Sequence, residues 1–268
     1  MDPTDSVMRL KALRILPNES CYLSLVLPLY NEERCLKRNF QTIVAHLDTL
    51  QKGYEIILVN DGSTDGTASI IRDIVDVNPQ TKSVSSSMNN GKGHAVRTGV
   101  LNATGKYIVH TDADLAVPVG FIGSCLRILE TGIPVVVASR HLLESNMKVR
   151  EGPLRQFLGE SFRRFAKLTL GLKVSDITCG LKGCERNAAL EIFSRLKINR
   201  WGYDAELVFV AQRLGYRIGE IPVDWYHSFD SKVKVVSASV KTLLETFQIR
   251  YYHVTKRYSV ASKEEGGL

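Results

Sequence analysis

Residues 22–32, YLSLVLPLYNE, set a pattern that recurs along the first half of the chain: an apolar run of strand length ends abruptly in polar residues. The pattern returns at residues 54–63, YEIILVNDGS, and at residues 106–114, KYIVHTDAD. Short apolar runs that alternate with longer amphipathic stretches are typical of consecutive βαβ units. The sequence therefore predicts an α/β fold with a mostly parallel central sheet flanked by helices.

The expected elements follow from the two hydrophobic periods, and no internal repeat is present. The predicted strands are Tyr22–Leu29, Tyr54–Val59, Lys106–Thr111 and Pro134–Ala138, with a weaker one at Thr81–Ser87. The predicted helices are Glu33–Leu50, Thr64–Val77, Gly93–Ala103 and, in the less regular second half, Gly152–Leu170, Tyr203–Leu214 and Ala238–Tyr252. We expect one domain over residues 21–258, ending in an amphipathic helix, between flexible segments 1–20 and 259–268.

Composition limits the classes of partner. Lys and Arg number 35 against 28 Asp and Glu, which favours anionic partners such as phosphates or anionic lipid. Nucleic acid is disfavoured, because the basic residues are not interleaved with an aromatic stacking platform. The five cysteines are odd in number and form no CxxC motif, so neither a disulfide framework nor a zinc site is indicated. A reducing compartment fits best, and we expect a cytoplasmic location.

Membrane contact is expected to be peripheral. The first 20 residues hold early acids and no sustained apolar run, so no signal peptide is predicted, and no apolar stretch approaches the ~20 residues that span a bilayer. The last predicted helix mixes apolar and basic residues. It either lies on anionic lipid or packs on the core with a basic solvent face.

Two carboxylates close together follow the third of these runs, at Asp112 and Asp114. Ligands of parallel sheets sit beyond the carboxyl ends of the strands, so these side chains are expected at the mouth of a cleft. They suit Mg²⁺ or Mn²⁺, which take one or two protein carboxylates and complete their shell with water and substrate phosphates. The alternative is a solvated turn that caps the helix near Pro118.

Two further turns carry candidate binding residues. Asp61, in the stretch NDGSTDG, either belongs to a helix-capping turn or accepts hydrogen bonds from the N–H edge of a nucleobase. Lys92, in NGKGH, would supply a point charge to a phosphate, although the spacing matches neither a P-loop nor a dinucleotide fingerprint.

Taken in order, PLYNE at residues 28–32, NDGSTD, NGKGHA and DAD resemble glycosyltransferase family 2 with a GT-A fold. The second half continues the likeness in SR at 139–140, DITCGLK at 176–182 and RWGYDAEL at 200–207. These resemble polyprenyl-phosphate glycosyltransferases, and most of all the dolichyl-phosphate β-glucosyltransferase branch. The likeness covers about residues 23–236.

The resemblance implies a role for each matching residue. Around the base and ribose of a nucleotide-diphosphate sugar it places Pro28, Tyr30, Glu32, Val59 and Asp61. It assigns the diphosphate, through the metal, to Asp112, Ala113 and Asp114. Arg140 would face the phosphates, Arg155 would meet the acceptor phosphate, and Lys232 would lie in a segment that closes over the donor.

We expect three acids in the second half to orient the sugar or acceptor: Asp176, Asp204 and Glu206. Asp204 and Glu206 fall at a predicted helix start, where they could instead interact with the helix dipole. We take Asp114, Arg140 and Arg155 as the residues closest to the chemistry.

The resemblance implies an inverting transfer of a hexose, with glucose from UDP-glucose as the expectation, to polyprenyl or dolichyl phosphate on the cytoplasmic face of a membrane. A separate membrane protein could supply an anchor, since relatives carry membrane segments that are not seen here. Alternatives are mannose from GDP-mannose, a non-lipid acceptor, and a regulator that binds nucleotide sugar without turnover.

Overall fold

The structure, a computed structural model, describes residues 21–147, 153–226 and 235–258, without the side chains of residues 147, 153–158 and 235–240. Its strands are β1 (Leu23–Leu29), β2 (Tyr54–Asp61), β3 (Thr81–Ser86), β4 (Tyr107–His110), β5 (Val135–Ser139), β6 (Asn146–Met147), β7 (Lys182–Glu185), β8 (Ile218–Pro222) and β9 (Asp224–Trp225). Its helices are α2 (Leu36–Thr49), α3 (Thr67–Val77), α4 (Lys92–Leu101), α5 (Gly120–Glu130), α6 (Pro153–Leu170), α7 (Arg186–Phe193), α8 (Tyr203–Arg213) and α9 (Val235–Val254).

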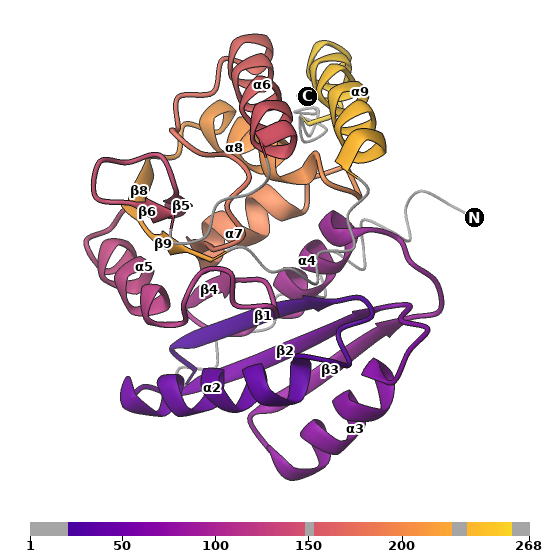
Figure 1. Cartoon of the computed structure of the whole chain (residues 1–268). Coiled ribbons are helices and arrows are strands. Elements are labelled where there is room, and N and C mark those ends of the chain that lie inside the picture. The colour runs from indigo at the N-terminus through magenta and orange to yellow at the C-terminus, as the bar shows by residue number, and fades with distance from the viewer. Residues whose placement is uncertain (1–20, 148–152, 227–234, 259–268) are drawn as a thin grey trace, which may run out of the picture.

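A seven-stranded sheet in the order β3-β2-β1-β4-β7-β5-β8 forms the centre of the molecule (Figure 1). All neighbouring pairs are parallel except those of β7, which runs antiparallel to both β4 and β5. The predicted α/β fold is therefore confirmed, including the weak strand at Thr81. The short strands β6 and β9 form a separate parallel pair.

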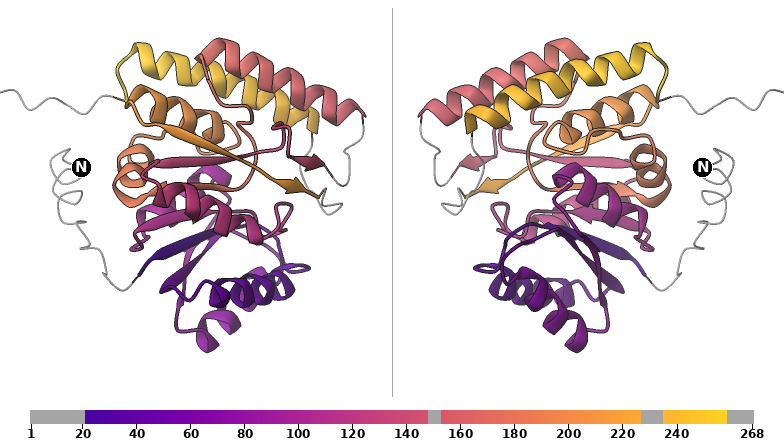
Figure 2. Two further views of the ribbon diagram at one scale, coloured as in Figure 1. Left: turned by 90° about the vertical axis from the view of Figure 1, so that its left-hand side faces the viewer. Right: turned by 90° about the vertical axis from the view of Figure 1, so that its right-hand side faces the viewer.

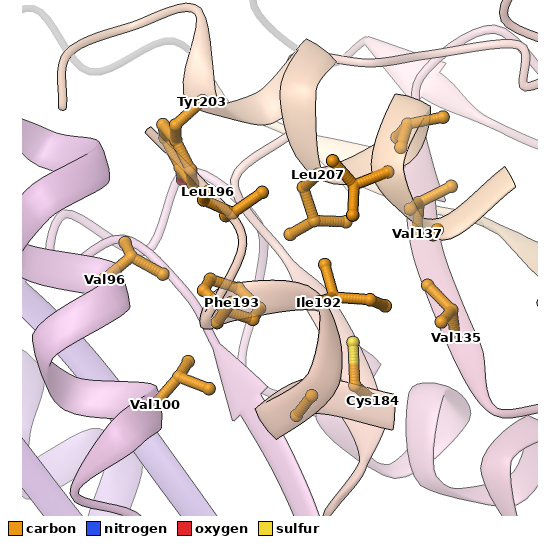
Figure 3. Close-up of a cluster of buried hydrophobic side chains, with 14 of the residues drawn as sticks. Val96, Val100, Val135, Val137, Cys184, Ile192, Phe193, Leu196, Tyr203 and Leu207 are labelled. Atoms are coloured by element: carbon orange, nitrogen blue, oxygen red, sulfur yellow. The ribbon is translucent and has the colours of Figure 1, made fainter. Parts of the chain in front are cut away.

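The sheet is covered on both faces, which is why its strands read as continuous apolar runs. In β1, Leu25 and Leu27 face a core cluster built with α2, α3 and α5, whereas Val26 faces a second cluster built with α4, α7 and α8. Figure 3 shows part of the second cluster, where Phe193 and Ile192 of α7 lie between Val100 of α4 and Leu207 of α8.

The sequence did not predict β7, β8 or α7. Strand β7 reads KGCE and has no apolar run, yet it lies inside the sheet. Its first residue, Lys182, is only 1% exposed. A charged residue at such a position is tolerated only with a partner, which the sequence pattern does not reveal.

Helices α6 and α9 lie side by side along the margin of the molecule that is farthest from α2 and α3 (Figures 1 and 2). Helix α9 packs inward through Thr246 and Ile249, both 0% exposed. In the described ranges, no helix combines the length and the apolar character that a membrane crossing requires.

Candidate active site

The turn after β4 presents Asp112 and Asp114 at the carboxyl edge of the sheet. Its backbone is fixed by the Leu115 N–H, which donates to the Asp112 carbonyl at 3.2 Å, and by the Asn39 side-chain amide, which donates to the Ala113 carbonyl at 2.8 Å. Leu115 adopts a φ of 54°, a left-handed conformation that a leucine rarely takes. Such strain is typical of functional turns, because the surrounding structure must hold it in place.

The two carboxylates repel each other. Burial raises the pKa of Asp114, and the charge of Asp112 raises it further. A bound cation would relieve this cost. Within the described residues, no group of three or more His, Cys, Asp or Glu side chains could hold a metal ion. The donor set therefore fits an ion such as Mg²⁺, which needs one or two carboxylates and takes its other ligands from water and phosphate.

Lys92, the first residue of α4, contacts this turn. Its ammonium lies 2.6 Å from Asp112 Oδ1, with the lysine side chain 14% exposed and the aspartate side chain 33% exposed. Burial lowers the pKa of Lys92, but the carboxylates of Asp112 and Asp204 outweigh that effect and raise the pKa overall. Lys92 is therefore a permanent positive charge beside the turn.

Gly180 lets a second loop pass directly over Asp112. A Cβ on Gly180 would lie 2.2 Å from Asp112 Oδ2, a distance that real contacts do not reach. The loop of residues 176–181 leads into β7, and a side chain at position 180 would displace the Asp112 carboxylate from its present place. Gly180 belongs to the motif DITCGLK, but the sequence does not predict its contact with Asp112, because the two residues are 68 positions apart (180 − 112).

Asp61 holds the start of α4. Its two carboxylate oxygens accept hydrogen bonds from the backbone N–H groups of Asn90 at 3.0 Å and Gly91 at 2.8 Å. The side chain is 3% exposed. The nucleobase contact that the sequence suggested for Asp61 stays a prediction, while the structure adds a positioning role one residue before Lys92.

The loops after β1 and β2 are joined to each other. Asn31, with a φ of 58°, accepts from the Thr64 N–H at 2.7 Å, and the Glu32 N–H donates to Thr67 Oγ1 at 2.7 Å. Tyr30 is 40% exposed at this edge, and Pro28 and Glu32 are half-buried. These three predicted donor residues are therefore accessible from solvent.

Val59 requires a correction. Its side chain is 1% exposed and packs in the core, where a Cβ on Gly99 of α4 would meet it at 3.0 Å. The resemblance placed Val59 around the donor, but the structure leaves only its main chain for such a contact. The sheet is covered on both faces, so a side chain within this part of β2 is buried whichever face it takes.

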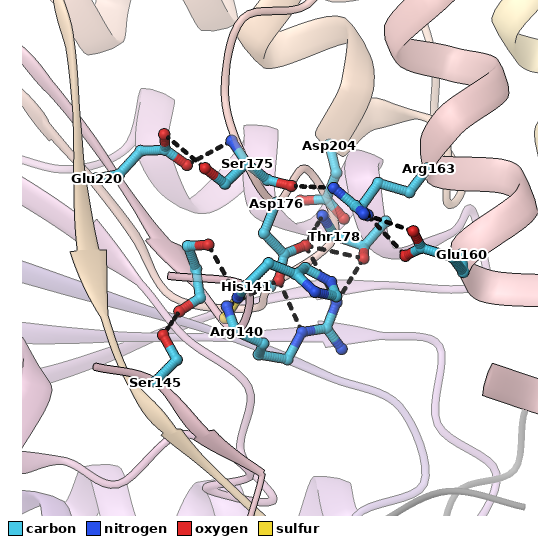
Figure 4. Close-up of polar contacts among 12 residues, drawn as sticks. Arg140, His141, Ser145, Glu160, Arg163, Ser175, Asp176, Thr178, Asp204 and Glu220 are labelled. Carbon is cyan, nitrogen blue, oxygen red and sulfur yellow. Dashed lines mark hydrogen bonds and ion pairs between the residues drawn. The ribbon is translucent and has the colours of Figure 1, made fainter. Parts of the chain in front are cut away.

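Arg140 follows β5 and is oriented by Asp176 (Figure 4). The Arg140 guanidinium donates to both Asp176 oxygens, through Nε at 2.7 Å and Nη2 at 3.1 Å, and to Thr178 Oγ1 at 2.7 Å. Its carbon Cζ lies 5.5 Å from the centroid of the Trp225 ring. Fork-like pairing of this kind fixes the plane of a guanidinium.

Asp176 is 0% exposed, so its predicted role in orienting sugar or acceptor, which stays a prediction, would be exerted through a neighbouring residue. Burial alone would raise its pKa, but the charge and hydrogen bonds of Arg140, with the Thr178 N–H, hold that pKa well below its usual range. Asp176 therefore stays ionised and acts through Arg140.

Asp204 and Glu206 are also buried against protein groups. Asp204, 4% exposed at the start of α8, pairs with the Lys182 ammonium at 2.5 Å, and that ammonium also donates to the Cys179 carbonyl at 2.6 Å. Glu206, 0% exposed, accepts from the backbone N–H groups of Lys197 and Ile198, both at 2.9 Å. Both carboxylates hold neighbouring protein segments, and their predicted contact with a sugar stays a prediction.

Two predicted site residues escape a full description. Lys232 lies outside the described residues. Arg155 belongs to α6, but its side chain is not described. The structure thus brings together Lys92, Asp112 and Asp114 around one turn, and it places Arg140 at the end of β5, separated from β4 by β7.

The chain was compared with known proteins. Residues 24–193 match the family described as Glycosyl transferase family 2. A dolichyl-phosphate beta-glucosyltransferase of Trichomonas vaginalis is 32% identical over 254 residues, which cover 91% of this chain and 75% of that protein. The protein of the same name from Dictyostelium discoideum is 30% identical, with 92% of this chain and 79% of its own length covered.

Solved structures show the same fold. Glucosyl-3-phosphoglycerate synthase from Mycobacterium tuberculosis, in complex with Mn²⁺, UDP and glucosyl-3-phosphoglycerate, is similar with a TM-score of 0.65 and 20% identity, covering 93% of this chain and 85% of that chain. A mannosyltransferase from Pyrobaculum calidifontis, in complex with GDP-Man and Mn²⁺, gives a TM-score of 0.58 at 20% identity, with 93% and 71% covered. At this identity the likeness establishes the fold, which is GT-A.

Proposed function

This chain belongs to glycosyl transferase family 2, and from that premise we propose that it transfers glucose from UDP-glucose to dolichyl phosphate. Relatives of about 30% identity over nine-tenths of the chain carry the name dolichyl-phosphate beta-glucosyltransferase. One observation in the structure carries the proposal: a strained turn that presents two carboxylates and a lysine together at the carboxyl edge of the sheet.

The donor would bind along the carboxyl edge of β1, β2 and β4. Tyr30 and Glu32 are accessible there for the base and ribose, together with Pro28 and the main chain of Val59. Asp61 keeps the start of α4 in place, so Lys92 can face the diphosphate. Arg140, held in a fixed plane by Asp176, would add a second positive charge on the phosphates.

A divalent cation fits between the diphosphate and the side chains of Asp112 and Asp114. When bound, it would neutralise charge that builds up on the departing diphosphate. The related structures contain Mn²⁺, and the carboxylate pair would accept Mg²⁺ equally well by ligand type.

The acceptor needs no general base. By analogy with phosphorylated side chains, a phosphate monoester has a second pKa near ~6 and is already largely ionised at neutral pH. One phosphate oxygen of the acceptor attacks the anomeric carbon, the bond from that carbon to the diphosphate oxygen breaks, and its electron pair leaves with UDP. The in-line geometry inverts the anomeric centre. The protein's task is then to align two anionic groups, with Arg155 of α6 assigned to the acceptor phosphate.

We further propose that the outer faces of α6 and α9 contact the membrane that contains the acceptor. Four residues of α9, here called the α9 apolar stripe, share one face and are 56–70% exposed: Leu244, Phe247, Tyr251 and Val254. Exposed basic residues, Lys241, Arg250 and Arg257, lie on the same helix or just after it. Leu168 of α6, 86% exposed, adds to the apolar surface, and the rings of Phe165 and Phe247 join the two helices at 5.4 Å.

This arrangement combines the two alternatives that the sequence left open for the last helix. The helix packs on the core through Thr242, Thr246 and Ile249, while its larger apolar residues face outward. Apolar side chains flanked by basic ones bind the surface of anionic bilayers. The five free thiols agree with a reducing compartment and thus with the cytoplasmic face of the membrane. A separate anchoring protein would be an additional partner.

The deciding experiment incubates the purified chain with UDP-glucose or GDP-mannose, a short polyprenyl phosphate or 3-phosphoglycerate, and Mg²⁺ or Mn²⁺. We expect a lipid-linked hexose by mass spectrometry only with UDP-glucose, polyprenyl phosphate and a divalent cation. Product on 3-phosphoglycerate would refute the lipid acceptor, product from GDP-mannose would refute the donor, and full turnover in EDTA would refute the metal.

Membrane binding has its own test. Co-sedimentation of the chain with vesicles of phosphatidylcholine and phosphatidylserine should fall about tenfold when Phe247 and Tyr251 are both changed to Ser. Each change removes apolar area that would be buried in the bilayer on binding. Gln248→Ser, an exposed polar change on the same helix, is the matched control. Equal sedimentation of all three proteins would contradict the assignment of this face.

A further inference from the structure

Lys92 sits between the carboxylate turn and an aromatic ring. Its ammonium lies 2.6 Å from Asp112 Oδ1 and 5.5 Å from the centroid of the Trp201 ring. Trp201 is 41% exposed. A lysine over the face of a tryptophan is attracted by the ring, and the attraction grows when the ammonium is shielded from water.

Two glycines hold the lysine in this place. A Cβ on Gly91 would lie 2.5 Å from the Asn199 carbonyl oxygen, and one on Gly93 would lie 2.5 Å from Tyr203 Cβ. The His94 N–H donates to the same Asn199 carbonyl at 2.9 Å. The start of α4 is therefore pressed against residues 198–203, the segment that carries Trp201. The glycines of NGKGH serve this contact, which explains why the motif matches no phosphate-loop spacing.

Asp112 is the acid in direct contact with Lys92, whereas Asp204 and Asp114 act on that lysine from farther away. Lys182, the next lysine inward, already pairs with Asp204 at 2.5 Å. Asp114 accepts from the Ala116 N–H at 3.0 Å, so its carboxylate is oriented by the turn itself. A divalent cation on the turn would need the Asp112 oxygen that Lys92 now contacts, and two cations cannot share it without mutual repulsion.

We infer that Lys92 is the resident counter-ion of Asp112, and that it gives up this contact when a divalent cation binds. It then remains against the Trp201 ring, where its charge is available to the donor's diphosphate. This inference rests on the proposed function, because it assumes that Asp112 and Asp114 bind a metal. It gives Lys92 a positioning role before any donor arrives and assigns Trp201 a role that the sequence did not suggest.

The test measures Mn²⁺ binding to the full chain without donor, by the electron paramagnetic resonance signal of free Mn²⁺. Charges at this distance change the proton affinity of a carboxylate by about tenfold or more, so we expect Lys92→Met to bind Mn²⁺ about tenfold more tightly than wild type. With Mn²⁺ present, the same variant should bind UDP more weakly. The matched control is Lys106→Met, which removes another lysine that lies over a ring, 5.0 Å from the centroid of Tyr107.

A second variant tests the same inference from the opposite direction. Trp201→Leu removes the ring that holds the released ammonium, so Mn²⁺ binding should weaken about threefold, within the range of exposed cation–π contacts. This variant decides the matter if circular dichroism shows that Lys92→Met does not fold. Unchanged Mn²⁺ affinity in a folded Lys92→Met, or tighter binding in Trp201→Leu, would overturn the inference alone. A wild-type chain that binds no Mn²⁺ would instead contradict the proposed function.

Discussion

The two lateral sides of the sheet, as distinct from its two faces, hold their polar residues in different ways. On the side of β1 and β2, side chains such as Asn31 and Asp61 accept hydrogen bonds from backbone N–H groups of neighbouring loops. On the side of β5 and β7, buried acids pair with cations: Asp176 with Arg140, and Asp204 with Lys182. We call these the hydrogen-bonded side and the ion-paired side.

The difference has an energetic meaning. A hydrogen bond between neutral groups, such as that of Asn31, contributes on the order of 1 kcal/mol and can be lost without leaving an unpaired charge. A buried ion pair contributes little net stability when intact, but removal of one partner leaves the other charge buried without compensation. The ion-paired side should therefore respond to substitution and to pH far more strongly than the hydrogen-bonded side, with the carboxylate turn of β4 between them.

The turn itself should give the largest effect. Asp114→Ala removes a proposed metal ligand, and we expect turnover to fall about a thousandfold, the upper range for loss of one electrostatic contact to a transition state. The melting temperature should not fall, since the change also removes repulsion from Asp112. Steady-state assay and thermal denaturation measure the two effects. Asp76→Ala, an exposed change on α3, is the control, and turnover near wild type would exclude the metal role of Asp114.

Next comes the buried pair of the ion-paired side. Asp204→Ala leaves the Lys182 ammonium buried with, among the described residues, the Cys179 carbonyl as its remaining hydrogen-bond partner, so the free energy of unfolding in urea should drop by about 3 kcal/mol. The double variant Lys182→Met with Asp204→Leu should recover most of this loss because no charge remains. If the single variant loses less than about 1 kcal/mol of unfolding free energy, water reaches this pair, and the ion-paired side is no more sensitive than the hydrogen-bonded side.

Low pH should destabilise the protein mainly through the ion-paired side. The pKa of Asp176 is lowered in the folded state, so its contribution to stability is present above the ordinary aspartate pKa of about 4 and is lost as pH falls towards the folded-state value. Between pH 5 and pH 2 the wild type should lose roughly 2 kcal/mol more than Asp176→Asn, which cannot titrate there. Urea unfolding at stepped pH measures this. Parallel pH curves for the two proteins would assign acid sensitivity elsewhere.

The hydrogen-bonded side should give the smallest effect. Asn31→Ala removes the acceptor of the Thr64 N–H and places alanine at a φ of 58°, at a cost of about 1 kcal/mol. Asn31→Gly, which tolerates that φ, should lose only part of it. Urea unfolding separates the two. A loss as large as that of Asp204→Ala would remove the distinction between the two sides.

The elements that the sequence predicts, and those that it does not, follow the same division. Hydrophobic periodicity is a local signal, so the strands and crossover helices up to β5 are predicted to within a few residues. It fails at β7, whose letters KGCE are compatible with a central strand only because Asp204 neutralises Lys182. That partner lies 22 positions away in sequence, and no local pattern announces it.

The candidate site divides likewise. The carboxylate turn was predicted from strand-end position and ligand chemistry, and it does lie at the carboxyl edge beside Lys92. The orienting roles of Asp176, Asp204 and Glu206 stay predictions, and the structure adds that all three are buried and contact protein groups. Motif likeness alone does not say whether a residue faces substrate or protein. Gly180 and Trp201 were not recognised as contacts of the turn and of Lys92, since both contacts depend on how distant segments approach each other.

The reversed direction of β7 links the two sides mechanically. Because β7 runs antiparallel to β4 and β5, the six residues that lead into it, 176–181, lie at the carboxyl edge of β4 and β5. Asp176, the first of them, binds Arg140, and Gly180 lies directly over Asp112. The two contacts are therefore four peptide bonds apart along the chain (180 − 176). The two groups proposed to hold the donor's diphosphate are thus joined by one short segment, and an insertion within it would change the distance between them.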